Sequence, residues 1–454
     1  MEQLQHLNRL SEVNSNKGVR FLHKAATPGC HCPMHTALAT LLSVGGVSSL
    51  VVGMPECGYY SRFVMDSPYG RQGELHYVYE LDANEVVFGC REGLMKALLR
   101  MEQEGAKMIL LIITCIPALI GEDAQAVIEE LSETMQAKLF FMDVAHFKRN
   151  GYQSGYSLFF EKLADILEYE AGKAESKLLN LLGSSEGSDM KDFKELAVLQ
   201  GIRVNPCDER CSMEQLKQTV YGTVSIVLSV KMLGLAKRLY GRFGIPYVCF
   251  YHRFLAEDIA EGYSQVLKLL GIINQEVTAE AHMIQRELNE ITEQPDNQNK
   301  TGGFPEENSS CPENLRDYHS KLMLLQGQSK STLTGIRYMA ASPELDVLPV
   351  SAYLCELGME PVLLHVEEYY EDYDLWKEKL LSRGIDPYIT YVADRSRLAE
   401  AVGEQQIQLS FGTFQGFSQD RCLTEREISI LNSLCGYERS MKLVQLILQR
   451  IIAA

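Results

Sequence analysis

Short apolar segments alternate with amphipathic segments over residues 1–170, and this alternation restricts the fold more than any other feature of the sequence. A segment such as VSSLVV (47–52) is uncharged and apolar, which is typical of a buried strand. Strands that alternate with helices favour a parallel sheet with helices on both faces. We predict strands at 47–52, 76–80, 108–114 and 137–143, and helices at 34–44, 90–103, 122–135 and 155–169.

The same alternation recurs twice further along the chain. A second unit begins at KLLNLLG (177–183) and a third at GIRYMAA (335–341). With 454 residues, the chain is too long for a single core. We therefore predict an α/β fold of three parallel-sheet domains in series. Their predicted bounds are 1–175, 176–290 and 331–454, with a polar linker and helix at 291–330.

Composition excludes several classes of function. The net charge of −17 argues against nucleic acid or an anionic membrane as the main partner. The uncharged stretch 25–55 is broken by Pro and Gly, so we expect no membrane span. Twelve cysteines behind an N-terminus without an apolar signal segment indicate a reducing, cytoplasmic location. No P-loop, GxGxxG or HExxH motif is present, so any ATP is expected to be hydrolysed by another protein.

Three cysteines lie where a parallel sheet gathers its ligands. Cys57, in GMPECGYYSR (53–62), and Cys115 each follow a predicted strand, and Cys32 precedes the first helix. We predict a tight, exposed turn around Cys57. Thiolates on such loops can share a metal or an iron–sulfur cluster. Spacing alone also allows three unconnected thiols, and Cys30 competes with Cys32.

The residues around these cysteines suit a cluster. Gly53 and Gly58 would let the backbone approach an inorganic group closely. Helices that begin after Cys32 and Cys115 would stabilise thiolates with their N-terminal N–H groups. Tyr59 would shield the cluster from water.

Four segments in the first third of the chain carry its most distinctive motifs. They are CPMHTA (32–37), GMPECGYYSR (53–62), DANEVVFGCREGL (82–94) and TCIPALIGEDAQAV (114–127). These segments resemble motifs of the nitrogenase component 1 family, with Cys90 in place of a family Gly. That family includes molybdenum–iron protein subunits, cofactor-assembly scaffold subunits, light-independent protochlorophyllide reductase subunits and the reductive cyclase of coenzyme F430 synthesis.

The resemblance implies three Rossmann-like domains and a dimer with an identical or paralogous subunit. It implies a four-iron or eight-iron cluster at the subunit interface, with Cys32, Cys57 and Cys115 as ligands from this chain. An ATP-dependent iron–sulfur reductase would deliver electrons, and the cluster would pass them to a small-molecule substrate. Two alternatives stay open: a scaffold for metal-cluster assembly, and a non-redox interaction protein that keeps the fold.

The chain also departs from the family pattern. Family members that bind the molybdenum–iron cofactor hold it with one Cys in the second domain and one His in the third. The stretch 224–247 contains no cysteine, and no histidine follows His365. We therefore expect neither that cofactor, anchored in the usual way, nor N₂ reduction by this chain alone.

Other candidate ligands have ordinary explanations as well. Cys207 and Cys211, in CDERC, could bind a ligand or could be incidental thiols of a polar loop. His31 and His35 flank Cys32 and could be cluster ligands or residues of a helix start. His146 follows a predicted strand and could lie near the cluster or the substrate.

Overall fold

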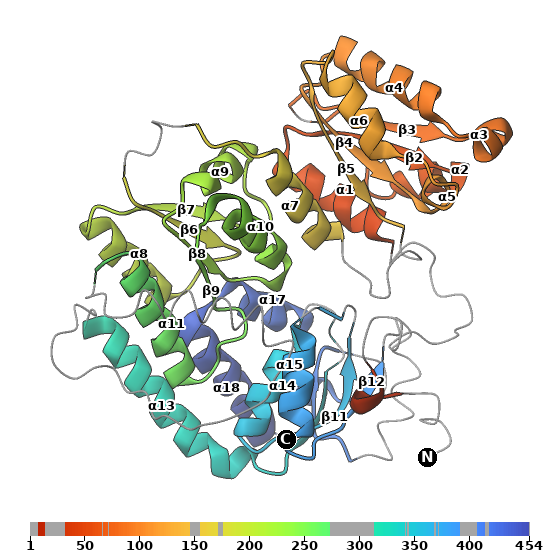
Figure 1. The fold of residues 1–454 in the computed structure, drawn as a ribbon. Coiled ribbons are helices and arrows are strands. Elements are labelled where there is room, and N and C mark those ends of the chain that lie inside the picture. Colours follow the sequence, from red (N-terminus) through yellow and green to blue (C-terminus); the bar gives the residue numbers. More distant parts are fainter. Residues whose placement is uncertain are drawn as a thin grey trace.

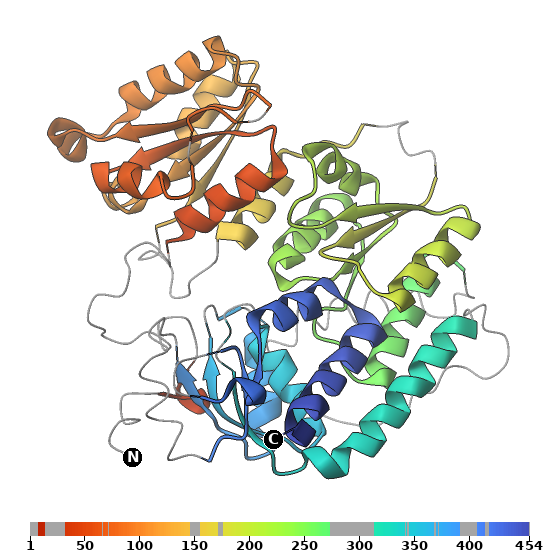
Figure 2. The ribbon, with the colours of Figure 1, turned by 180° about the vertical axis from the view of Figure 1, so that it is seen from behind.

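The chain forms three α/β units, each around its own sheet, and Figures 1 and 2 show them from opposite sides. The structure is a computed structural model. It describes residues 8–13, 32–65, 67–70, 72–145, 155–170, 176–272, 313–340, 342, 345–366, 369–370, 372–390, 406–413 and 417–453. The predicted fold class, parallel-sheet α/β units in series, is confirmed.

The first unit is a four-stranded parallel sheet between two layers of helices. Its elements are α1 (Pro33–Val44), β2 (Ser48–Gly53), α2 (Pro55–Ser61), β3 (His76–Glu80), α3 (Ala83–Phe88), α4 (Arg91–Gln103), β4 (Met108–Ile113), α5 (Cys115–Leu119), α6 (Ala124–Ser132), β5 (Lys138–Asp143) and α7 (Gly155–Ile166). The strand order is β3–β2–β4–β5. Strands β2 and β4 are buried along their whole length because they carry no charged residue. Side chains of α4 and α6 pack on one face of the sheet, and those of α1 and α7 pack on the other.

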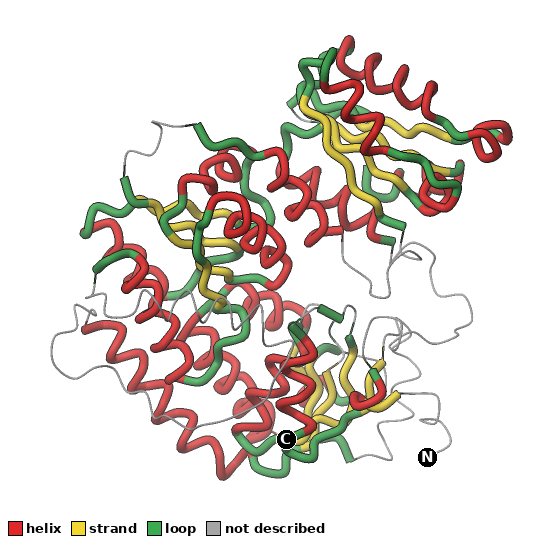
Figure 3. The backbone as a smooth tube through the Cα atoms, in the orientation of Figure 1, coloured by secondary structure: helices red, strands yellow, loops and turns green. Residues whose placement is uncertain are grey.

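The second unit repeats this plan with four parallel strands in the order β7–β6–β8–β9. Its elements are β6 (Leu178–Leu182), α8 (Ser188–Leu199), β7 (Arg203–Cys207), α9 (Met213–Gln218), β8 (Val224–Val227), the short 3-10 helix η4 (Val230–Met232), α10 (Leu233–Phe243), β9 (Tyr247–Cys249) and α11 (Ala256–Leu269). Figure 3 shows helices packed beside the strands in each unit.

The third unit has six strands in the order β1–β12–β11–β10–β13–β14. Its elements are β1 (Asn8–Arg9), α13 (Glu313–Leu333), β10 (Arg337–Ala340), α14 (Val347–Glu356), β11 (Glu360–His365), α15 (Tyr373–Leu381), β12 (Tyr388–Thr390), β13 (Leu409–Phe411), β14 (Cys422–Leu423), α17 (Glu425–Ser433) and α18 (Gly436–Ala453). Helix α18 packs on α13 and also on α8 of the second unit. No helix in the described part of the chain is both long and apolar enough to cross a membrane.

Strand β1 comes from the start of the chain but belongs to the third sheet. Asn8 and Arg9 pair antiparallel with β12, and Leu10 and Val13 are buried in the core of the third unit. The Lys377 ammonium donates a hydrogen bond of 2.6 Å to the carbonyl of Val13. The first residues described therefore close the edge of a sheet formed more than 300 residues later.

Most predicted elements of the first unit agree with the structure to within three residues at each end. The predicted tight turn around Cys57 is wrong, because residues 55–61 form the helix α2. Met54 has an extended backbone and Pro55 occupies the first helical turn, where proline's missing N–H costs nothing. The Gly and Pro residues of GMPECG therefore start a helix.

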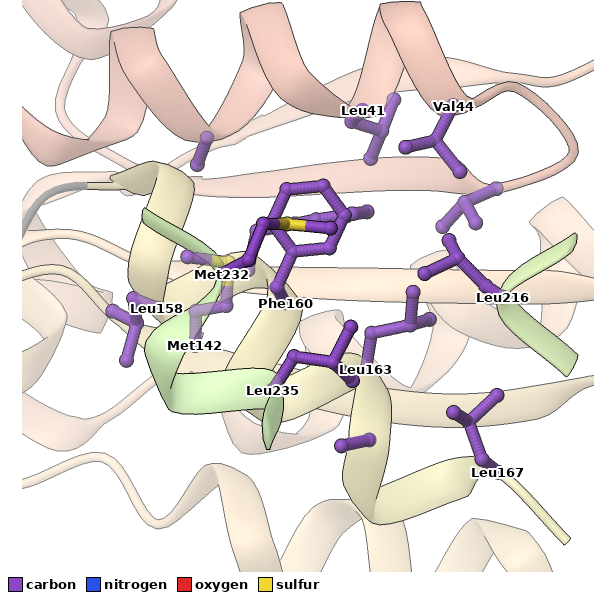
Figure 4. Close-up of a cluster of buried hydrophobic side chains, with 14 of the residues drawn as sticks. Leu41, Val44, Met142, Leu158, Phe160, Leu163, Leu167, Leu216, Met232 and Leu235 are labelled. Carbon is purple, nitrogen blue, oxygen red and sulfur yellow. The ribbon is translucent and has the colours of Figure 1, made fainter. Parts of the chain in front are cut away.

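One apolar core joins the first and second units. Helix α7 packs against α1 on one side and against α10 on the other. Figure 4 shows Leu41 of α1, Phe160 and Leu163 of α7, Met232 of η4 and Leu235 of α10 packed together. Because these side chains are at most 1% exposed, the core holds the first sheet against the second.

Candidate metal centre at the edge of the first sheet

Two of the candidate cysteines lie at the same edge of neighbouring strands. Strand β2 ends at Gly53 and is followed by α2, which carries Cys57 in its first turn. Strand β4 pairs with β2 and ends at Ile113, and Cys115 begins α5 directly afterwards. Both thiols therefore sit beyond the carboxyl ends of the two central strands, where open α/β sheets bind ligands.

Thr114 connects these two strand ends. Its hydroxyl donates a hydrogen bond of 2.8 Å to the carbonyl of Val52 and accepts one of 3.5 Å from the Cys57 thiol. Thr114 is also the N-cap residue of α5 and is 3% exposed. A buried hydroxyl thus fixes the position of Cys57 relative to the start of the helix that bears Cys115.

Cys32 approaches the same edge from α1, of which it is the N-cap residue. Burial is the main cause that raises the pKa of the Cys32 thiol to about 11; the Met34 backbone N–H opposes the rise, and the nearby thiols of Cys115 and Cys57 add to it. The three thiols therefore lie within electrostatic range of one another. All three are half-buried, so the protein brings the three predicted ligands together at one partly accessible edge.

The arrangement does not suit a single metal ion. Within the described ranges, no group of three His, Cys, Asp and Glu side chains converges closely enough to hold one. A mononuclear zinc site needs its donors at about 2.0–2.3 Å from one point. An iron–sulfur cluster instead distributes its thiolates over separate iron atoms. Three thiols that do not meet at one point fit a cluster better than a single ion.

The two predicted glycines are crowded by the protein itself. A Cβ on Gly53 would lie 2.4 Å from the Thr114 hydroxyl oxygen and 2.9 Å from the Cys57 sulfur. A Cβ on Gly58 would lie 2.7 Å from a carboxylate oxygen of Glu80. Gly53 therefore lets Thr114 and Cys57 pack against the end of β2, and Gly58 lets α2 lie against β3.

Exposed apolar side chains surround this edge. Tyr59 of α2, Phe63 in the turn after it, Val87 and Phe88 of α3 and Leu119 of α5 are between 59% and 84% exposed, and we call these five residues the apolar rim. Helix α3 buries none of its side chains. Figure 1 shows α2, α3 and α5 grouped at one end of the first sheet. The predicted shield, Tyr59, is 59% exposed and packs edge-on against Tyr60 and Phe63.

Cys30, His31 and His146 fall outside the described residues. The ring of His35 packs edge-on against Tyr60. Cys90 is 1% exposed in the core on the opposite face of the first sheet, where burial and the Glu122 carboxylate raise the pKa of its thiol to about 12.

Cys207 and Cys211 are not in an exposed polar loop. Both thiols are buried in the apolar core that joins the first and second units, and their sulfur atoms are 3.0 Å apart. They are remote in sequence from the three candidate ligands, and Cys207 is the last residue of β7 in the second sheet.

A sequence model described as nitrogenase component 1 type oxidoreductase matches residues 32–451. The chain belongs to this family. The match begins at Cys32 and runs through all three units. Membership of the nitrogenase component 1 family supports an oxidoreductase-like role and metal binding.

Curated relatives within this family include both a reductase and an assembly protein. A light-independent protochlorophyllide reductase polypeptide of Gloeobacter violaceus is 26% identical over 141 residues, which cover 29% of this chain and 28% of the relative. The nitrogenase iron-molybdenum cofactor biosynthesis protein NifE of Nostoc sp. is 24% identical over 233 residues, which cover 48% of this chain and 47% of the relative. The matches span less than half the length of these relatives.

Solved structures agree with the fold over nearly the whole chain. The structure titled "Nitrogenase Cp1 at pH 6.5" has a TM-score of 0.58 and 15% identity, and covers 96% of this chain and 95% of its own. "Nitrogenase Cp1 at pH 5" has a TM-score of 0.52 and 12% identity, with coverages of 95% and 91%. These likenesses establish the nitrogenase component 1 fold.

Proposed function

We propose that this chain is a subunit of a nitrogenase-like two-component reductase with an iron–sulfur cluster at a subunit interface. Cys32, Cys57 and Cys115 would hold the cluster. The observation that carries the proposal is that these three half-buried thiols lie near one another at the carboxyl edge of β2 and β4. Each of the three positions offers a thiolate sulfur, and thiolate sulfur is the usual ligand of such clusters.

A second chain would complete the site. A [4Fe–4S] cluster takes four thiolates, so three thiols from one chain leave it incomplete. The apolar rim beside the thiols is a surface that a partner would cover, since grouped exposed apolar side chains mark interaction sites. An identical or paralogous component 1 polypeptide would therefore cover the rim and add its own ligands.

The chain's residues would prepare the ligands for a negatively charged cluster. When bound, the cluster supplies one-electron transfer. The backbone N–H groups of Met34 and His35, in the first turn of α1, interact with the Cys32 thiol and favour its thiolate form. Burial opposes ionisation, so the thiol of Cys32 keeps its proton until a cluster displaces it.

Electrons would come from a separate ATP-dependent iron–sulfur reductase and pass to a small-molecule substrate in a cytoplasmic setting. The relative named as a light-independent protochlorophyllide reductase polypeptide supports a reductase role. The chain itself lacks a P-loop, so ATP hydrolysis is assigned to the partner.

A scaffold for metal-cluster assembly is the second candidate. The relative named as a cofactor biosynthesis protein supports it. The stretch 224–247, which forms β8, η4 and α10, offers no cysteine as a cofactor anchor, and this fits a protein that releases what it binds.

Metal analysis of the anaerobically purified full-length chain tests the proposal. Iron and acid-labile sulfide in comparable amounts, with broad visible absorbance, are expected. A colourless, iron-free oligomer from an iron-replete anaerobic host would contradict both candidates. Bleaching of that absorbance by an iron–sulfur ATPase only when ATP is supplied would favour the reductase, and transfer of the iron to an acceptor protein would favour the scaffold.

A further inference from the structure

A pair of thiols lies at the carboxyl edge of the second sheet, apart from the candidate metal centre. Cys207 is the last residue of β7, and Cys211 follows after a turn in which its backbone N–H bonds to the carbonyl of Asp208 at 3.1 Å. Ser212 then caps α9 by accepting a hydrogen bond from the Gln215 backbone N–H. The turn is thus tied at both ends, to a strand and to a helix.

Both sulfur atoms lie inside the protein. Cys207 is 0% exposed and Cys211 is 3% exposed, and both belong to the core shared by the first and second units. The carbonyl of Cys207 accepts a hydrogen bond of 2.9 Å from the Gly183 N–H, which fixes β7 against the end of β6. This environment holds the two side chains in one arrangement.

The sulfur atoms are 3.0 Å apart, so each thiol is the nearest reaction partner of the other. A disulfide bond is about 2.05 Å long, so the atoms need to close by only about 1 Å. The hydrogen bond with Cys211, followed by burial, holds the pKa of Cys207 well above its usual value. Cys207 is therefore a protonated thiol beside Cys211 in the reduced pair.

We propose that Cys207 and Cys211 form a reversible intramolecular disulfide when the chain meets a low-molecular-weight disulfide. Cys211 attacks one sulfur of the small disulfide and releases one thiol molecule. Cys207 then attacks the Cys211 sulfur of the mixed disulfide and releases the second thiol molecule. The pair loses two electrons and two protons, and the two released thiols carry them away. Local opening of the turn admits the reagent.

Disulfide formation would change the position of a charged side chain at the edge of the second sheet. Glu209, inside the turn, accepts hydrogen bonds of 3.2 Å from the Ser229 hydroxyl and 3.4 Å from the Lys231 ammonium, both just beyond β8. Closing the sulfur pair shortens the turn that carries Glu209. The oxidation state of the pair would therefore adjust the position of this carboxylate relative to the carboxyl end of β8.

The sequence provides a direct assay, because Arg210 lies between the two cysteines. The full-length protein is incubated anaerobically in buffers of glutathione and glutathione disulfide, quenched with acid, alkylated in denaturant and digested with trypsin. Cleavage after Arg203, Arg210 and Lys217 places the cysteines in separate peptides, 204–210 and 211–217. We expect the two peptides to be recovered as one linked species that increases with the fraction of glutathione disulfide and disappears on reduction.

Two variants make the result specific. Cys207→Ala should abolish the linked species and leave Cys211 as a mixed disulfide with glutathione, whereas Cys435→Ala, at another buried thiol, should leave the link unchanged. Separate recovery of both peptides, each alkylated or each carrying glutathione, in pure glutathione disulfide would overturn the proposal. Because the readout is a peptide mass, it is independent of any bound cluster and of the proposed function.

Discussion

The carboxylate of Asp189, at the start of α8, accepts a hydrogen bond of 2.8 Å from the backbone N–H of Tyr437, at the start of α18. The same carboxylate accepts bonds from the Tyr263 hydroxyl at 2.9 Å and the Glu438 N–H at 3.3 Å. In return, the Ser188 N–H donates to the Glu438 carboxylate. Each helix thus supplies the acceptor for the free N–H groups of the other.

Removing this shared acceptor should destabilise the protein. Asp189→Ala removes the acceptor of the Tyr263 hydroxyl and of the Tyr437 N–H, which costs about 1–3 kcal/mol of unfolding free energy. Urea denaturation measures the loss. Glu195→Ala, at an exposed position on the same helix, is the matched control and should change stability by less than about 0.5 kcal/mol. Equal effects of the two substitutions would contradict this role for Asp189.

Stability should fall as the pH rises toward neutrality, partly because of Asp346. Burial, reinforced by Asp372, raises the pKa of Asp346 from 3.8 to about 7. Its Oδ1 accepts a bond of 2.7 Å from the Tyr373 hydroxyl, but its buried Oδ2 has no hydrogen-bond partner in the described structure. The folded protein keeps this proton where the unfolded chain releases it, so the contribution is complete below about pH 4 and lost above about pH 7.

Asp346→Asn tests this pH dependence because an amide stays neutral. The variant should unfold at higher urea than the wild type at about pH 8 and should show a flatter stability profile between roughly pH 4 and 7. Asp317→Asn, on the surface of α13 in an ion pair with Lys321, should retain the wild-type profile. If the stability of Asp346→Asn changed with pH as steeply as that of the wild type, the pH dependence would come from other groups.

Gly53→Ala should be costly because of crowding alone. The added methyl group would meet the Thr114 hydroxyl and the Cys57 sulfur, and overpacking of this kind costs about 1–3 kcal/mol. Gly241→Ala makes the same chemical change in α10. Apart from its own helix backbone, no atom lies within 4 Å of the added Cβ there, so the substitution should stabilise the helix by about 0.5–1 kcal/mol. Chemical denaturation of both variants distinguishes local crowding from a general effect of the substitution.

The apolar rim should control the oligomeric state if it is the proposed interface. Phe88→Glu introduces a charge at an 84% exposed position and should weaken subunit association about tenfold or more, since a central aromatic contributes about 2 kcal/mol. Sedimentation equilibrium measures the change. Leu199→Glu, at an 83% exposed position on α8, should leave association unchanged. A wild-type chain that is monomeric with full iron content would refute the interface.

Loss of a proposed ligand should remove iron. Cys57→Ser should lower the iron and sulfide content of the anaerobic protein by roughly half or more, because serine rarely replaces a cluster thiolate. Cys422→Ser, at a buried thiol of β14 bonded to the Ser418 carbonyl, is the control and should keep its iron. Metal analysis and visible absorbance give the answer, and equal iron in both variants would exclude Cys57 as a ligand.

The strand-end position of the thiols could be predicted because it follows from local rules. Uncharged runs identified β2 and β4, and parallel neighbours end at the same sheet edge, so Cys57 and Cys115 had to be close. The helix at 55–61 was missed because Gly and Pro suggested a turn, whereas Pro55 starts a helix. Thr114 gave no signal of its own, since its role depends on the contact with Val52.

The helix that carries two residues of the apolar rim, Val87 and Phe88, could be predicted from the sequence. Asp82 and Glu85 form a capping box, which predicts a helix start, and the exposed Val87 and Phe88 follow within that helix. The burial of Cys207 and Cys211 was hidden by the charged residues between them, because Asp208 and Arg210 are exposed while the two thiols are buried. The contact between Asp189 and Tyr437 joins residues 248 positions apart, which no local pattern encodes.

The contacts between the N-termini of α8 and α18 also affect the order in which the protein can fold during synthesis. As the chain leaves the ribosome, α8 emerges with Asp189 but without the residues that complete its surroundings. Those residues are made about 250 positions later. The strand Asn8–Arg9 can pair only after its partners Tyr388 and Ile389 have been synthesised, and this separation along the chain is longer still. The second and third units therefore reach their final form only after residues 436–453 have been synthesised, and until then the nascent chain exposes apolar surface that chaperones can bind.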